Sequence, residues 1–208
     1  TPEKQRRYQQ AYLGYVMNTC SSDKNILVDS SGLPNAIRIP LTRINVHNGK
    51  VSNEIRLIFV VQKKTGLPIF YMAAPGNVVD VSTLRRILLH LESLGVAVES
   101  CIIDAGYNSG SNLDFFYDGN HCCRIGFLTR VRANDSNLKK MIAEDLATLE
   151  SRENFVNFED RYLFIKKKEV LVGSRGDNPA FLYLGLDCSR LNDEQRKLFK
   201  KAKKTKLS

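Results

Sequence analysis

The sequence lacks any apolar run near the roughly 20 residues that a membrane-spanning helix needs. Its first residues also show no signal-peptide pattern, because no apolar segment follows an initial basic stretch. These two absences exclude a membrane protein and a secreted one as the first expectation. We therefore expect a cytoplasmic protein without a membrane partner.

Cysteine pairs are also missing. The five cysteines are an odd number, and no two of them form a Cys-x-x-Cys motif, which argues against a disulfide framework and for a reducing compartment. His121, Cys122 and Cys123 stand together, but adjacent residues on a strand point to opposite faces, and no second ligand pair follows at zinc spacing. We expect no zinc site here.

Acidic residues are absent from the C-terminal segment. Seven cations and no acid lie between Arg196 and the end, so the net charge of +9 leaves +9 − 7 = +2 for the rest of the chain. Such a basic tail is typical of a nucleic-acid contact, and equally of a solvated helix end or linker. The lysines that we single out as DNA-binding candidates are Lys200, Lys201, Lys203 and Lys204.

With 208 residues, 43% of them apolar and 25% charged, the chain is long enough for a sizeable core, and its length corresponds to one domain or to one domain plus an appended piece. It begins at Thr1 rather than at Met, so we expect it to belong to a longer protein. No internal repeat is evident. After Glu153 the sequence pattern changes to short β-like pieces, which predicts two parts, residues 1–152 and residues 153–208.

The first part predicts strands that alternate with helices. Pro40 favours an edge position for one strand, Asn48-Gly49 signals a turn, Asp80 suits a helix N-cap, and Gly95 suits a helix C-terminal cap. The predicted helices are 3–17, 84–94, 109–118 and 135–151, and the predicted strands are 25–29, 36–41, 55–61, 67–72, 100–104 and 124–131. The second part predicts a β-rich insertion with short pieces at 155–158, 162–165, 170–172 and 181–186, followed by the basic tail.

Two aspartates, Asp29 and Asp104, each end a short apolar run that predicts a buried strand. A carboxylate in this position lies at the rim of a sheet, and two of them on neighbouring strands can share a divalent cation, as in metal-dependent phosphoryl transfer. Each Asp taken alone is also a common first residue of a turn.

Three local patterns occur with the order strand, hairpin, helix, strand, helix. They are Asp29 on the first strand, residues 66–71 with Pro75-Gly76-Asn77, and Asp104-Ala105-Gly106-Tyr107-Asn108-Ser109 running on to Asn112-Leu113. Together they resemble the catalytic core of DDE transposases of bacterial insertion sequences, in the IS4-like group. The resemblance covers roughly residues 22–190. Asp104 fits the second catalytic Asp of that group, in an Asp-x-Gly-Tyr-x-Ser-x-x-Asn-Leu context, and Asp29 fits the first more loosely.

The resemblance implies an α/β fold, a ribonuclease H-like mixed sheet flanked by helices, with the start of a β-rich insertion. It implies that Asp29 and Asp104 are catalytic and bind two Mg²⁺ or Mn²⁺ ions, which suit hard oxygen ligands. It also implies DNA as the partner, both transposon ends and target, a possible homodimer in the full-length protein, and DNA cleavage followed by strand transfer.

The third acid of that family is a Glu in a helix, in a Tyr-x-x-Arg-x-x-x-Glu type of context. Glu144, Glu150 and Glu153 all precede the expected insertion, and we identify no such context. We therefore expect this chain alone to be inactive. The alternatives to a transposase core are a nuclease of the same fold, an inactive DNA-binding remnant, and an unrelated α/β protein.

Three further residues are weaker candidates for DNA contacts. Tyr107 is interpreted either as a side chain that stacks on a base or as a core residue. Arg130 and Arg132 occupy alternate positions of a predicted strand, hence one face of it. That face is interpreted either as a phosphate contact or as a solvated surface.

Overall fold

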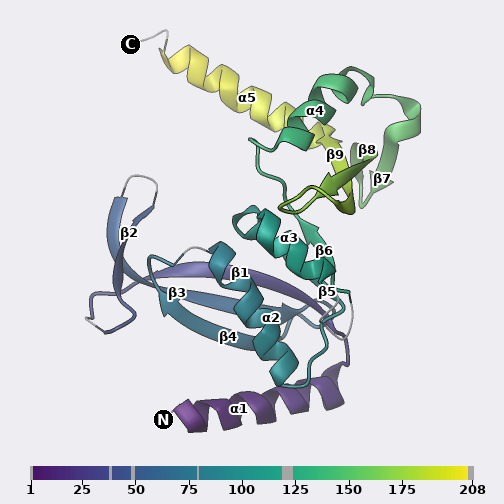
Figure 1. The fold of residues 1–208 in the computed structure, drawn as a ribbon. Coiled ribbons are helices and arrows are strands. Elements are labelled where there is room, and N and C mark those ends of the chain that lie inside the picture. Colours follow the sequence, from purple (N-terminus) through teal and green to yellow (C-terminus); the bar gives the residue numbers. More distant parts are fainter. Residues whose placement is uncertain (1, 38, 48–49, 79, 119–123, 206–208) are drawn as a thin grey trace. The chain divides into compact units, whose positions relative to one another are not determined.

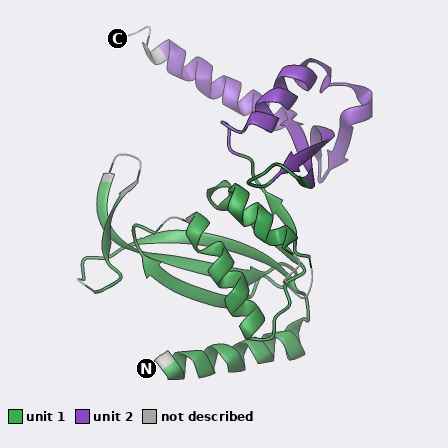
Figure 2. Ribbon diagram, viewed as in Figure 1, with its two compact units in different colours: residues 1–131, 173–178 green, residues 132–172, 179–208 purple. Residues whose placement is uncertain are grey.

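The computed structural model describes residues 2–37, 39–47, 50–78, 80–118 and 124–205. The chain divides into two compact units (Figure 2), which we describe separately. Unit 1 comprises residues 1–131 and 173–178, and unit 2 comprises residues 132–172 and 179–208. These units describe packing within the chain, and the predicted domain boundary near residue 153 stays a prediction.

Unit 1 is built on a six-stranded mixed sheet (Figure 1). Its core order is β4-β3-β1-β5-β6, and β2 pairs with the start of β3. β3 runs antiparallel to both β1 and β4, whereas β5 runs parallel to β1 and β6 parallel to β5. The strands are β1 (Asn25–Pro34), β2 (Arg43–His47), β3 (Lys50–Gln62), β4 (Pro68–Pro75), β5 (Ser100–Ile103) and β6 (Gly126–Thr129). This strand order and these directions make the fold ribonuclease H-like, as predicted.

Helices cover both faces of this sheet. One face carries Val28, Val60 and Phe70, which are paired across three strands, and the Phe70 ring lies 5.0 Å from that of His90 on α2 (Leu84–Ser93). On the same face α3 (Gly110–Tyr117) stacks Phe116 on Phe127 of β6. On the opposite face α1 (Pro2–Tyr15) contacts β4. The buried apolar residues of α2 recur at helical spacing and form much of the core between helix and sheet: Leu84, Ile87, Leu88 and Leu91.

Two predictions about the first strands were wrong. The strand expected at 25–29 is formed but continues to Pro34, because residues beyond Asp29 keep pairing with β3 as far as the Pro34–Glu54 pair. Asp29 therefore lies within β1 and not at the rim of the sheet, where it was expected. The strand expected at 36–41 is not formed by the described residues there. Asn35 instead closes a turn, in which its Nδ2 donates to Thr42 Oγ1 and its Oδ1 accepts from the backbone N–H of Ile37.

The boundaries of α2 follow its backbone chemistry. Asp80 starts the short 3-10 turn η2 (Asp80–Ser82) and does not cap α2, which begins after Thr83. At the other end Gly95 has φ +84°, and the N–H groups of Gly95 and Val96 donate to the carbonyls of Glu92 and Leu91. This left-handed residue ends the helix, as the sequence predicted.

The described residues of unit 2 form a three-stranded sheet ordered β7-β8-β9, in which β7 and β8 are antiparallel, with two helices and two 3-10 turns. β8 is continuous, although its lysines predicted a break between two short strands. Lys166 and Lys168 remain in the strand because both pair with Asp145 of α4. The elements are α4 (Ser136–Asp145), η4 (Leu146–Thr148), η5 (Arg152–Asn154), β7 (Phe155–Phe158), β8 (Arg161–Val172), β9 (Asn178–Asp187) and α5 (Cys188–Thr205).

The basic segment predicted as a tail is helical as far as Thr205, because α5 includes it. None of the helices in the described residues is long and apolar enough to cross a membrane. The turn at Asn48-Gly49 and the triplet His121-Cys122-Cys123 lie outside the described residues.

Candidate active site

The sheet register brings Asp29 and Asp104 to neighbouring positions. β1 and β5 pair in parallel from Asn25–Ser100 to Val28–Ile103, and the two aspartates are the next residues on their strands. The parallel pairing ends there because the chain turns after Asp104 into the 3-10 turn η3 (Ala105–Tyr107), while β1 continues beside β3. The predicted placement on adjacent parallel strands is therefore confirmed. The separation of the two carboxylates stays a prediction.

Both aspartates belong to the same face of the sheet. Val28 and Ile103 are buried on the face that α2 and α3 cover, and side chains alternate along extended backbone. Asp104 keeps an extended backbone, with φ −77° and ψ 166°, so the alternation reaches it. Asp29 and Asp104 therefore both belong to the opposite face, and both are exposed to solvent.

A row of side chains crosses this face. Asp29 pairs with Phe59 of β3, and Phe59 pairs with Tyr71 of β4. The rings of Phe59 and Tyr71 are 37% and 38% exposed, so solvent reaches both. On the other side of Asp104 the next residue of the row is Arg130, because Ile103 pairs with Thr129 at the ends of β5 and β6, and Asp104 and Arg130 directly follow them. Sequence reasoning did not single out Phe59 or Tyr71, since only the register of three strands aligns them with Asp29.

Arg130 is the basic group of this row. Its Nη1 lies 3.9 Å from Asp104 Oδ1, and the two side chains are 83% and 59% exposed, so the ion pair is a weak, solvent-screened one. The backbone of Arg130 is held more firmly, because Asn108 Nδ2 donates to its carbonyl oxygen at 3.3 Å. β6 ends at Thr129, so the predicted alternation of Arg130 and Arg132 on one strand was wrong. Arg132 belongs to unit 2.

The segment after Asp104 is fixed by the polar residues of its motif. Ser109 caps α3, with its Oγ accepting from the N–H of Asn112 at 3.2 Å. The buried Nδ2 of Asn112 donates to the carbonyl oxygens of Tyr107 at 2.8 Å and of Val81 at 3.0 Å. These bonds join η3, the turn after Asp104, to η2, the short turn that precedes α2. Among the residues of the motif, Asn112 is thus a positioning residue.

The donor set at this edge of the sheet suits a hard divalent cation. Asp29 and Asp104 supply carboxylate oxygens, and Oδ1 of Asp29 accepts from the N–H of Ser30 at 2.8 Å, which orients that carboxylate. In the part of the chain that the structure describes, no group of three or more His, Cys, Asp and Glu side chains is arranged as a metal site. The residues present therefore fit a metal through two ligands, with the remaining coordination positions left to other oxygens.

The other predicted DNA contacts have mixed outcomes. Tyr107 is only 1% exposed, so it is a core residue and its ring is not available to stack on a base. Lys200, Lys201 and Lys203 are exposed on α5. The side chain of Lys204 lies outside what the structure describes. DNA binding by these lysines stays a prediction.

α5 follows the β-rich segment and contains an Arg-x-x-x-Glu spacing. Arg190 and Glu194 have the spacing of the Arg-x-x-x-Glu half of the family context, and Arg190 Nε donates to Glu194 Oε1 at 3.1 Å. Asp187 stands where that context has Tyr.

Comparison with known proteins adds two solved structures. No family model matches the chain, and no curated protein matches it. It is similar to a chain of the piggyBac transposase synaptic complex with hairpin DNA, with 13% identity and a TM-score of 0.43, over 77% of this chain and 32% of that one. It is also similar to a chain of the Drosophila P element transposase strand transfer complex, with 12% identity and a TM-score of 0.33, over 72% of this chain and 35% of that one. The chain thus spans about a third of the length of each.

Proposed function

We propose that this chain is part of the catalytic core of a DNA transposase of the DDE, IS4-like type, in which Asp29 and Asp104 bind Mg²⁺ or Mn²⁺. The observation that carries the proposal is the Val28–Ile103 pair, which ends the parallel pairing of β1 and β5 immediately before the two aspartates. Two solvent-exposed carboxylates on one face of neighbouring strands suit hard cations. The motif that runs from Asp104 to Leu113 adds the sequence argument.

The residues around the two aspartates have different roles. Asp29 and Asp104 bind the metal, and Arg130 supplies a guanidinium that can reach a phosphate oxygen, because its ion pair with Asp104 is weak and exposed. Asn112 and Asn108 hold the turn after Asp104 and the backbone of Arg130 in position. A bound divalent metal would act as a Lewis acid on a phosphodiester and lower the pKa of the attacking hydroxyl or water.

A third acidic ligand is part of this proposal. That ligand is not assigned to a residue of this chain. With only two carboxylates engaged, metal binding is weak and cleavage is absent, because an open coordination shell holds the cation loosely.

Metal binding tests the carboxylate pair directly. We expect Mn²⁺, titrated into the full chain and followed by the electron paramagnetic resonance signal of the free ion, to bind weakly. Asp104→Asn and Asp29→Asn should each lower the affinity about tenfold or more, because each removes one of the two charged ligands. The matched control is Asp160→Asn, an exposed residue at φ +61°, where Asn is equally well tolerated. Equal Mn²⁺ affinity of all four proteins would refute the metal site.

A nicking assay on supercoiled DNA tests the reaction. We expect no specific cleavage by this chain with Mg²⁺ or Mn²⁺. Metal-dependent nicking that is lost in Asp104→Asn would show that this chain contains a third ligand after all. Nicking without any joining of DNA ends would favour the nuclease alternative. Nicking that survives Asp104→Asn would refute the assignment of Asp104.

A further inference from the structure

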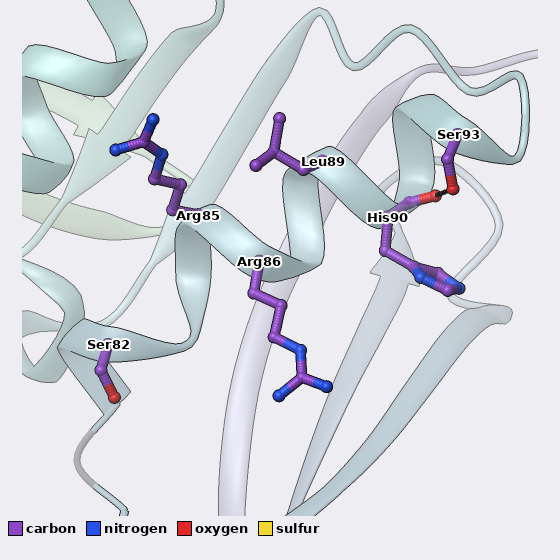
Figure 3. Close-up of a pocket in the computed structure, with 6 residues that line it drawn as sticks. All are labelled: Ser82, Arg85, Arg86, Leu89, His90 and Ser93. Atoms are coloured by element: carbon purple, nitrogen blue, oxygen red, sulfur yellow. Dashed lines mark hydrogen bonds between the residues drawn. The ribbon is translucent and has the colours of Figure 1, made fainter.

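A basic groove runs along the solvent side of α2, away from the aspartates. It is a shallow, open hollow of about 460 Å³, lined by six residues of α2 and the turn before it, none of them acidic (Figure 3). These residues are Ser82, Arg85, Arg86, Leu89, His90 and Ser93. Glu92 is the one acid of α2, and it is not a lining residue. Two guanidinium groups, an imidazole and two hydroxyls together make this surface complementary to a polyanion.

We propose that this groove binds the phosphodiester backbone of the DNA substrate, an inference that rests on the proposed function. Figure 3 shows the side chains of Arg85 and Arg86 extending in different directions from the helix. Two diverging guanidiniums do not close around a single phosphate group. They suit two separate phosphates of one polymer.

The dimensions of the groove agree with a polymer. The lining residues of α2 run from Arg85 to Ser93, eight residues apart, and a rise of about 1.5 Å per residue places them over about 12 Å of the helix. Successive phosphates of one strand are roughly 3.4 Å apart along the axis of a duplex. The groove is therefore several times longer than a single phosphate group requires.

Arg85 is held ready for such a contact. Its guanidinium carbon lies 5.2 Å from the centre of the Phe115 ring, and Phe115 is buried in α3. Stacking on this fixed ring restricts the side chain but leaves its N–H donors available to phosphate oxygens. Restricting the side chain before binding lowers the entropy cost of the contact.

The groove begins beside the segment that follows Asp104. Asn112 donates to the carbonyl oxygens of both Tyr107 and Val81, and Val81 directly precedes Ser82. The turns η2 and η3 also pack against each other. Asn112 thus ties the start of the groove to the segment that follows Asp104, although the groove and the aspartates lie on opposite sides of the sheet.

The test compares two double variants of the full chain that each remove two positive charges. Arg85→Gln with Arg86→Gln changes the groove, and Lys4→Gln with Arg6→Gln changes exposed positions of α1. DNA binding is measured by fluorescence anisotropy with a labelled duplex over a range of salt concentrations, after thermal melting has shown that both variants fold. For the groove variant we expect a roughly ten- to hundredfold loss of affinity at 0.1 M salt and a salt slope shallower by about 2. The α1 variant should bind like the unmodified chain.

Equal affinity and salt slope of the two variants would overturn the proposal. A second arm adds inorganic phosphate as competitor at constant ionic strength. Displacement of the duplex by micromolar phosphate, lost in the groove variant, would mean a site for a single phosphate group and would also overturn it. The proposed function fails separately, through unchanged Mn²⁺ binding in Asp29→Asn and Asp104→Asn, which does not involve α2.

Discussion

The side-chain amide of Asn112 donates a 2.8 Å hydrogen bond to the carbonyl oxygen of Tyr107. Asn112 is buried in α3, and Tyr107 ends the turn that follows Asp104. The same nitrogen donates to Val81, so one amide satisfies two backbone carbonyls from two separate turns. The position of the Asp104 segment thus depends on a residue eight positions later in the chain.

Asn112→Ala removes both hydrogen bonds and leaves two carbonyl oxygens without this donor. We expect a loss of roughly 1–3 kcal/mol in the free energy of unfolding, measured by urea denaturation. Mn²⁺ affinity at the aspartates should also fall, because the turn after Asp104 loosens. The control is Asn137→Ala, whose Nδ2 donates to the carbonyl oxygen of Leu171 in a solvent-exposed hydrogen bond, with an expected loss below about 1 kcal/mol. Unchanged stability of the Asn112 variant would contradict the positioning role.

Gly76 is a position where no side chain fits. A Cβ at this residue would overlap the backbone carbonyl of Glu54, a buried residue that accepts a hydrogen bond from Asn45. We expect Gly76→Ala to lower the free energy of unfolding by about 1–3 kcal/mol through this overlap. Gly14→Ala is the matched control, because that site in α1 has open space and a helix gains about 0.5–1 kcal/mol from Ala. Urea denaturation of both variants should therefore give changes of opposite sign.

Asp145 makes the stability of unit 2 depend on pH. The ammonium of Lys166, 2.8 Å from Asp145 Oδ1, lowers the pKa of that carboxyl, and Lys168 adds to the effect. A carboxyl whose pKa is lower in the folded state stabilises the fold above its unfolded pKa, and this contribution is lost as the pH falls through the folded pKa. We expect Asp145→Asn to melt at a lower temperature than the unmodified chain at pH 7.

This difference should shrink as the pH is lowered below about 4, the ordinary pKa of Asp, and through the lowered pKa of the folded state. Circular dichroism melts at a series of pH values measure it. Glu150→Gln, an exposed substitution of the same kind, should leave the melting temperature unchanged throughout. A difference between Asp145→Asn and the unmodified chain that stays constant from pH 7 to pH 2 would rule out the ion pair as its cause.

The C-terminal cations should bind DNA without sequence preference. Seven of them lie between Arg196 and Lys206, so the salt slope that they contribute is no steeper than roughly −6. Removing residues 196–208 should weaken the binding of a random duplex at low salt. The fold should be retained, since Leu198 and Phe199 of this segment are 66% and 73% exposed. Equal affinity of the full and shortened chains would show that the charge serves only as a solvated surface.

Local sequence determined much of the architecture. The apolar spacing of α2 and the glycine after it predict that helix within one or two residues, because a helix that packs on a sheet needs a continuous apolar stripe and a left-handed terminal residue. The apolar runs before Asp29 and Asp104 predict the two central strands in the same way. The ribonuclease H-like fold followed from the resemblance, and the strand order of unit 1 confirms it.

Pairing between distant segments decided the rest. β1 runs past Asp29 because β3 offers it partners as far as Glu54, and β8 runs through its lysines because Asp145 neutralises two of them. Neither partner is adjacent in sequence. Arg130 leaves the strand for the converse reason, since β6 has no pairing with β5 beyond Thr129. Strand limits depend on neighbours that local propensity does not contain.

The candidate site also depends partly on local sequence and partly on tertiary contacts. The sequence by itself determined its chemistry, because Asp29 and Asp104 end apolar runs and the motif after Asp104 is local. Only the tertiary structure decided its composition. The register of β1 with β5 aligns the two aspartates, and cross-strand pairing adds Phe59 and Tyr71 to their row. Packing also buried Tyr107 in the core. Register and packing are properties of contacts between residues that lie far apart in the chain, and those contacts form only when it folds.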